Sequence, residues 1–119
     1  MRQLSFRIVY GYDTAEDARR EESAVVVSML DIVIELPETT SLKDKRSVVS
    51  SLKTRLRAKF RISCAEVDLL DSLAFAEIGA ALVSNSREFG ESVMHKALAV
   101  VESEFGVRVH DAQIHSEVY

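Results

Sequence analysis

The sequence predicts a small α+β domain with the ferredoxin-like order βαββαβ, in which a four-stranded antiparallel sheet carries two helices on one face. Three observations predict this fold. The chain has 119 residues, which suits a single hydrophobic core. Its apolar residues change from an alternating to a helical period at two places along the chain. Two of the expected strands are separated only by a short hairpin loop.

The first strand shows the clearest alternation. Apolar residues share one face of this segment, namely Leu30, Ile32, Ile34 and Leu36. We expect the strand to begin near Val25 and to end before Pro37, because proline has no backbone N–H to donate.

The first helix is expected from Leu42 to about Phe60. Its apolar stripe consists of Val49, Leu52, Leu56 and Phe60. Ser41 with Asp44 resembles a capping box in which Asp replaces the usual Glu.

The second half of the chain repeats the order of elements. Residues 62–67 and 73–83 are predicted as strands that flank a loop over residues 68–72. Asn85 or Ser86 can cap a second helix, which ends near Phe105 before Gly106. The expected apolar positions of this helix are Phe89, Val93, Ala97, Val100 and Val101. Residues from 107 to about 118 form the last strand.

An N-terminal extension, residues 1–23, precedes the predicted domain of residues 24–119. Apolar residues alternate near its start, at Leu4, Phe6, Ile8 and Tyr10. An additional edge strand is one interpretation of this pattern, and a loose terminal segment is the other.

Cysteine usage and hydropathy indicate the compartment. Cys64 is the single cysteine, so no disulfide can form within the chain and a Cys-based zinc site lacks its ligands. The first residues contain no sustained apolar run of the kind that signal peptides have, and no stretch is apolar enough to span a membrane. We therefore expect a cytoplasmic protein without a membrane partner.

The net charge of −4 conceals a strongly basic segment. Residues 43–61 contain eight basic residues and one acid, Asp44, although the whole chain has 15 basic and 19 acidic residues. On a helical projection Lys43, Arg46, Lys53, Arg57 and Arg61 follow one flank of the apolar stripe, while Lys45, Arg55 and Lys59 lie on the other.

This basic helix predicts contact with an anionic partner such as RNA. The candidate nucleic-acid-binding residues are Lys43, Lys45, Arg46, Lys53, Arg57 and Arg61. The structural alternative is a solvated helix face, where basic residues near the C-terminal end favour the helix dipole. That alternative does not explain Lys43, Lys45 and Arg46, because positive charge is unfavourable in the first turns.

No catalytic constellation is recognisable in the sequence. His110 and His115 are five residues apart and face opposite ways in a regular strand, so they do not form a metal pair, and His95 is expected on the helix surface. Cys64 is interpreted as a small buried hydrophobe. The scattered glycines form no phosphate-binding loop. We expect a protein that is not an enzyme and has no catalytic residues, cofactor, metal or small-molecule substrate.

The sheet face that the helices leave uncovered is expected to be acidic. Asp31, Glu35, Glu66 and Glu77 are the carboxylates predicted there. Such a face could bind a divalent cation or act as an acid/base pair, and its ordinary interpretation is a solvated polar surface. Either interpretation argues against RNA binding by the open sheet face.

A homo-oligomeric interaction module is the alternative function, with a dimer as its simplest form. The hypothetical self-association residues belong to the open sheet face and to the hairpin at residues 68–75, and they are Met29, Val33, Leu69, Leu70, Ala81 and Val83. This module would not bind nucleic acid.

Three segments resemble one known family. Ser41-Leu42-Lys43-Asp44-Lys45-Arg46, Ala65-Glu66-Val67 and Leu82-Val83-Ser84-Asn85 resemble the YlxP-like family of small bacterial proteins, a domain-of-unknown-function family. The resemblance covers residues 25–118. The chain departs from it at residues 72–75, where members usually carry a Trp-Gln pair, and in its N-terminal extension.

The resemblance implies a ferredoxin-like fold, a bacterial cytoplasmic setting, and genes beside those for transcription and translation-initiation factors. This neighbourhood suggests a non-enzymatic accessory protein associated with RNA, specifically with ribosomal RNA or a ribosomal particle.

Overall fold

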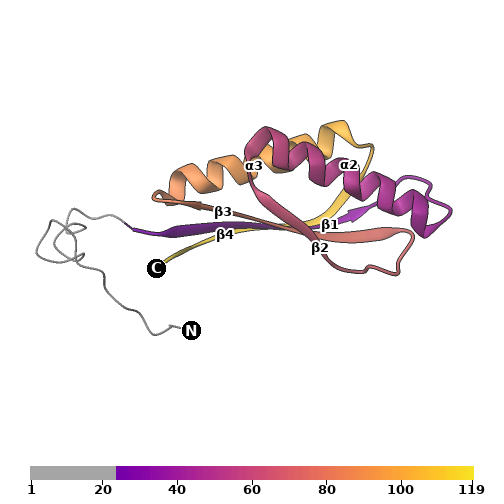
Figure 1. The fold of residues 1–119 in the computed structure, drawn as a ribbon, viewed down its shortest axis with the longest axis horizontal. Coiled ribbons are helices and arrows are strands. Elements are labelled where there is room, and N and C mark those ends of the chain that lie inside the picture. The colour runs from indigo at the N-terminus through magenta and orange to yellow at the C-terminus, as the bar shows by residue number, and fades with distance from the viewer. Residues whose placement is uncertain (1–23) are drawn as a thin grey trace, which may run out of the picture.

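The computed structural model describes residues 24–119 and confirms the ferredoxin-like α+β fold. Its elements, in chain order, are β1 (Val26–Glu35), α2 (Leu42–Phe60), β2 (Ser63–Asp68), β3 (Phe75–Ser84), α3 (Arg87–Glu104) and β4 (Arg108–Val118). The strands form one sheet in the order β2-β3-β1-β4, with antiparallel pairing throughout. Both helices lie on the same side of the sheet (Figure 1). The edge strand predicted within residues 1–23 lies outside the described residues.

The hydrophobic core lies between the sheet and the two helices. Along β1, burial alternates as the sequence pattern predicts, and Leu30, Ile32 and Ile34 are almost completely inaccessible to solvent. The helices contribute buried residues from one stripe each, including Leu52 of α2 and Met94 of α3. The residues between these core positions on β1 therefore face the open side of the sheet.

The start of α2 is fixed by its own polar side chains. Ser41 adopts extended backbone and its Oγ accepts a hydrogen bond from the Asp44 N–H over 3.1 Å. The Asp44 carboxylate turns back to Thr40, accepting from its backbone N–H at 3.2 Å and from its hydroxyl at 2.7 Å. These Thr40 hydrogen bonds lower the pKa of Asp44. The predicted Ser41 cap is confirmed, and the partner of Asp44 is Thr40.

Close packing of α3 on β1 depends on a glycine. A Cβ added at Gly90 would collide with the Ser28 side chain, whose Oγ shares a buried 2.8 Å hydrogen bond with Ser116 Oγ. Gly90 and Met94 therefore occupy the buried stripe of α3. The prediction that Phe89 belongs to this stripe is wrong, since its side chain is 57% exposed at the edge of the first helical turn.

Neither helix within residues 24–119 has the length and apolar character needed to cross a membrane.

Candidate nucleic-acid interface

The outer flank of α2 carries a line of cations. Lys43, Arg46, Lys53 and Arg57 fall within about 80° of the helix circumference and along about 21 Å of its axis, from 100° and 1.5 Å per residue. We call these four residues the basic strip. Lys53 is half-buried and the other three are exposed. Short side chains lie beside the strip, at Ser47, Ser50 and Thr54.

The edge strand β2 contacts the C-terminal half of the basic strip, Lys53 and Arg57. Arg57 Nη2 donates a hydrogen bond of 2.6 Å to the Cys64 carbonyl, and the Cys64 Sγ lies 3.6 Å from the Lys53 carbonyl oxygen. Desolvation raises the pKa of the Cys64 thiol, more strongly than the Arg57 and Lys53 charges lower it. Cys64 therefore acts as a small packed side chain that fixes α2 against β2.

Lys45 does not belong to this interface, which corrects its prediction as a nucleic-acid-binding residue. Its side chain is 1% exposed, and its Nζ lies 3.0 Å from Glu66 Oε2 and donates to the Leu69 carbonyl at 2.5 Å. A second carbonyl, that of Leu70, lies 3.4 Å away. Lys45 lies one turn before Val49, so it continues the apolar stripe and reaches under the β2–β3 hairpin.

The cations on the inner flank of α2 face α3. Arg55 binds Glu104 through hydrogen bonds of 2.9 and 3.3 Å. This contact raises the pKa of Arg55 and lowers the pKa of Glu104. It connects the two helices, so Arg55 is already occupied by a protein carboxylate.

Arg61 lies just beyond the helix end. Its backbone is left-handed, with φ of 55°, and its N–H donates to the Arg57 carbonyl over 2.9 Å. Its side chain is exposed, and it follows the last residue of the basic strip, Arg57, by four positions.

Within residues 24–119, no carboxylate forms an ion pair with a residue of the basic strip. The nearest acid in sequence, Asp44, is held by Thr40. The strip therefore presents positive charge that the described part of the protein leaves uncompensated.

The open sheet face, opposite the helices, carries negative charge. Asp31, Glu35 and Glu77 lie on it as predicted, because they alternate with the buried residues of β1 and β3. Glu66 does not, since it points toward the helices and meets Lys45. Sequence reasoning missed two further carboxylates near Glu77, those of Asp68 and Asp111. The described residues contain no cluster of side chains suited to a metal ion.

A β-bulge changes the prediction for the histidines. The β1–β4 register shifts between Val33 and Ile34, and the extra residue in β4 is His110. His110 therefore lies on the open face, where its Nε2 is 2.8 Å from Glu35 Oε1 and its ring meets Phe75 edge-on. His115, opposite Met29, shares this face, so the expected opposite orientation is wrong. The two histidines still lie in different rows of the sheet and do not form a pair.

The hypothetical self-association residues lie in two places, the open sheet face and the hairpin between β2 and β3. Met29 and Ala81 are neighbours across β1 and β3, and Val33 lies further along the same face. Val83, which is 68% exposed, lies at the end of β3 that is remote from the hairpin containing Leu69 and Leu70.

Comparison with known proteins identifies relatives without an assigned activity. The family described as "Protein of unknown function (DUF503)" matches residues 27–114. The uncharacterized protein YlxP of Bacillus subtilis (strain 168) is 36% identical over 63 residues, which cover 53% of this chain and 68% of that protein.

Proposed function

The chain belongs to the DUF503 family of proteins of unknown function, and from this premise we propose that it is a non-enzymatic accessory protein that contacts RNA through the basic strip. The charge of Lys43, Arg46, Lys53 and Arg57 along one flank, which residues 24–119 leave without a partner carboxylate, carries the proposal.

The chemistry of the strip suits a phosphate backbone. Lysine and arginine donate to phosphate oxygens, and the short side chains of Ser47, Ser50 and Thr54 allow the backbone to approach the helix closely. Each phosphate that is neutralised releases a counterion, so affinity falls as salt rises. The strip contains no aromatic side chain for base stacking, so the contact is expected to have little sequence preference.

The distribution of charge supports a defined orientation on RNA. The strip lies on the helix side of the sheet, on the flank next to β2, whereas the acidic open face is the other side of the sheet. An RNA strand is attracted by the former and repelled by the latter, so long-range steering favours approach from the helix side.

The resemblance of the chain to a family whose genes neighbour those of translation-initiation factors directs the proposal toward ribosomal RNA or a ribosomal particle in the bacterial cytoplasm. The proposal requires no cofactor, metal or small-molecule substrate.

A matched charge-reversal experiment tests the proposal. The probe is a fluorescein-labelled single-stranded fragment of ribosomal RNA, and the protein is the full chain. Lys43→Glu/Arg46→Glu changes two exposed cations of the strip. Lys96→Glu/Arg108→Glu changes the net charge equally at exposed positions elsewhere.

We expect the strip variant to weaken binding by at least about tenfold and to reduce the steepness of the salt dependence. The control variant is expected to bind nearly as the wild type does. Equal weakening by both variants would reduce the effect to net charge, and absence of RNA binding at low salt would reject the proposal. Sedimentation with ribosomal particles, with and without nuclease, then distinguishes a ribosomal target from free RNA.

Self-association is a second candidate, favoured by the exposure of Val83 and Leu70 at 68% and 57%. It predicts a mass that rises with protein concentration, whereas the RNA contact requires only one copy of the chain.

A further inference from the structure

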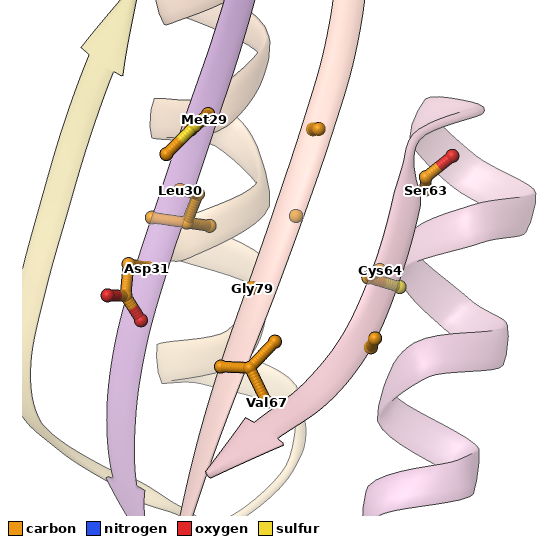
Figure 2. A pocket seen from close by; sticks show the side chains of 10 residues that line it. Met29, Leu30, Asp31, Ser63, Cys64, Val67 and Gly79 are labelled. Atoms are coloured by element: carbon orange, nitrogen blue, oxygen red, sulfur yellow. The ribbon is translucent and has the colours of Figure 1, made fainter.

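The open sheet face contains a shallow apolar hollow across β1, β3 and β2. Short residues line its floor, because Ala65 pairs with Gly79, and Ala81 is the next residue of β3 on the same face. Met29 and Val67 stand at its sides, 45% and 53% exposed. Figure 2 shows these two side chains flanking the stretch of β3 where Gly79 has none. The hollow has a volume of about 440 Å³ and is open to solvent.

Gly79 keeps the hollow open. A Cβ at this position would lie 3.2 Å from Val67 Cγ1, which is tighter than ordinary van der Waals contact. The hollow is therefore formed by the backbone of β3 and by the side chain of Val67, which lies at a register shift of β2 between Glu66 and Asp68. It is preformed rather than dependent on a loop movement.

Carboxylates surround one end of this apolar surface. Asp31 lines the hollow and is directly opposite Gly79 on β1. Glu77 is two residues from Gly79 on the same face, and Asp68 is its partner on β2. Asp111 of β4 also belongs to this group. It pairs with Val33 of β1, and Val33 pairs with Glu77 on its other side.

The neighbouring carboxylates affect the protonation of Glu77. Asp31 Oδ1 is buried and receives no hydrogen bond from residues 24–119 when both carboxyl groups are ionised. A proton on Glu77 supplies a donor to Asp31, and this hydrogen bond is the largest cause of the raised pKa of Glu77. Desolvation and the charges of Asp31, Asp68 and Asp111 raise it further.

The negative charge of these carboxylates disfavours two classes of ligand for the hollow, RNA and a second copy of the chain. RNA has the same sign as the surrounding carboxylates. A second copy packed on the same face brings the two acidic groups together when the two-fold axis passes beside them, and such like-charge contacts are costly when they are desolvated. A cationic occupant compensates the carboxylates that residues 24–119 leave unpaired.

We propose that the hollow docks a segment of a partner protein that carries an aliphatic side chain next to an arginine or lysine. The aliphatic side chain enters the space over Ala65, Gly79 and Ala81 and contacts Met29 and Val67. The neighbouring guanidinium or ammonium group binds Asp31 and Glu77. An arginine fits this pair well, because its planar fork offers several N–H donors to adjacent carboxylates. This inference does not depend on RNA binding by the basic strip.

Synthetic peptides with the required chemistry test the proposal. The probe is a fluorescein-labelled hexapeptide of alternating leucine and arginine, with both ends blocked. One comparison peptide replaces arginine with glutamate, and another replaces leucine with serine. Anisotropy measures affinity for the full chain, and amide chemical shifts in 1H–15N spectra locate the contact.

Four variants separate the hollow from general charge. Ala65→Leu fills the hollow from an exposed position, and Met29→Ala removes an exposed apolar contact. Asp31→Asn removes one carboxylate of the group. Glu117→Gln is the matched control, since it removes an exposed carboxylate of the same face that lies on β4, opposite Val27, and is not part of the carboxylate group. Their 1H–15N spectra show whether each variant remains folded.

We expect the leucine–arginine peptide to perturb amides of β1, β2 and β3 around the hollow, and neither comparison peptide to bind comparably. Ala65→Leu and Asp31→Asn should each weaken binding by about tenfold, Met29→Ala by less, and Glu117→Gln by less than about twofold. Equal binding of the serine–arginine peptide would show attraction by charge alone and overturn the proposal. So would unchanged affinity of a folded Ala65→Leu variant, or a dimer that occupies the hollow and excludes the peptide.

Discussion

The Nζ atom of Lys45 lies 3.0 Å from Glu66 Oε2, underneath the hairpin that joins β2 to β3. The same ammonium group binds the Leu69 carbonyl, and Leu69 has a left-handed backbone with φ of 62°. One buried charge therefore connects the start of α2, the Glu66 side chain on β2 and the turn of the hairpin. This position gives a lysine of the basic helix a structural role.

Replacing Lys45 is expected to destabilise the protein. Lys45→Met retains the aliphatic stem but leaves Glu66 without its countercharge and the hairpin carbonyls without their donor, at a cost of about 3 kcal/mol in the free energy of unfolding. Lys43→Met, at an exposed position on the same helix, should change it by less than about 0.5 kcal/mol. Urea unfolding of the two variants measures both values. Similar unfolding midpoints would contradict the buried position of Lys45.

Lys45 also shows where sequence reasoning succeeds and where it fails. The helical period correctly placed Val49, Leu52 and Leu56 in the core, and Lys45 occupies the next position of the same stripe. Its charge led to the prediction of a surface residue, because an isolated buried ammonium is unfavourable. The compensating carboxylate, Glu66, is distant in sequence and becomes visible only when β2 packs against α2.

The open sheet face was predicted less completely than the fold. Alternation correctly placed Asp31, Glu35 and Glu77 there. The bulge at His110 has no glycine or proline to signal it, so the predicted orientation of the two histidines was wrong. The hollow arises from cross-strand pairing of Ala65 with Gly79, and this register is not encoded in either strand alone.

A second stability prediction concerns Gly90. Alanine normally favours a helix interior over glycine by about 1 kcal/mol. At Gly90 the added Cβ would meet Ser28, including its Cβ at 2.8 Å, and would disturb the buried Ser28–Ser116 hydrogen bond. Gly90→Ala is therefore expected to destabilise the protein by about 1–3 kcal/mol. Ser92→Ala, on the exposed side of α3, is the control and should be neutral or slightly stabilising. Thermal unfolding compares them, and a stabilised Gly90→Ala variant would contradict the close approach of α3 to β1.

A pH prediction follows from the carboxylate group around Glu77. Its pKa in the folded protein is raised above the ordinary value of 4.5 by hydrogen bonding to Asp31, desolvation and neighbouring charges. The stabilising effect of the proton is fully present below the unfolded pKa, and it is lost as pH rises through the folded pKa. Glu77→Gln removes this loss. The difference in unfolding free energy between the variant and the wild type should therefore favour the variant more at pH 7 than at pH 4.

Urea midpoints between pH 4 and pH 7 at low salt test this sign. Glu102→Gln, which removes an exposed carboxylate from α3, is the control. A Glu77→Gln variant that gains more stability at pH 4 than at pH 7 would contradict the interaction within the carboxylate group.

The last prediction concerns the independence of the two charged surfaces. The basic strip lies on the outer flank of α2, and the hollow lies on the opposite side of the sheet. Lys43→Glu/Arg46→Glu should therefore weaken RNA binding by at least about tenfold, while it leaves the affinity for the leucine–arginine peptide within about twofold. Ala65→Leu should have the reverse effect, because it fills the hollow without changing any charge of the strip. Anisotropy titrations of both variants with both probes give four affinities. Parallel losses for RNA and peptide in either folded variant would show a shared site or a general electrostatic effect, whereas opposite losses would assign each ligand to its own face.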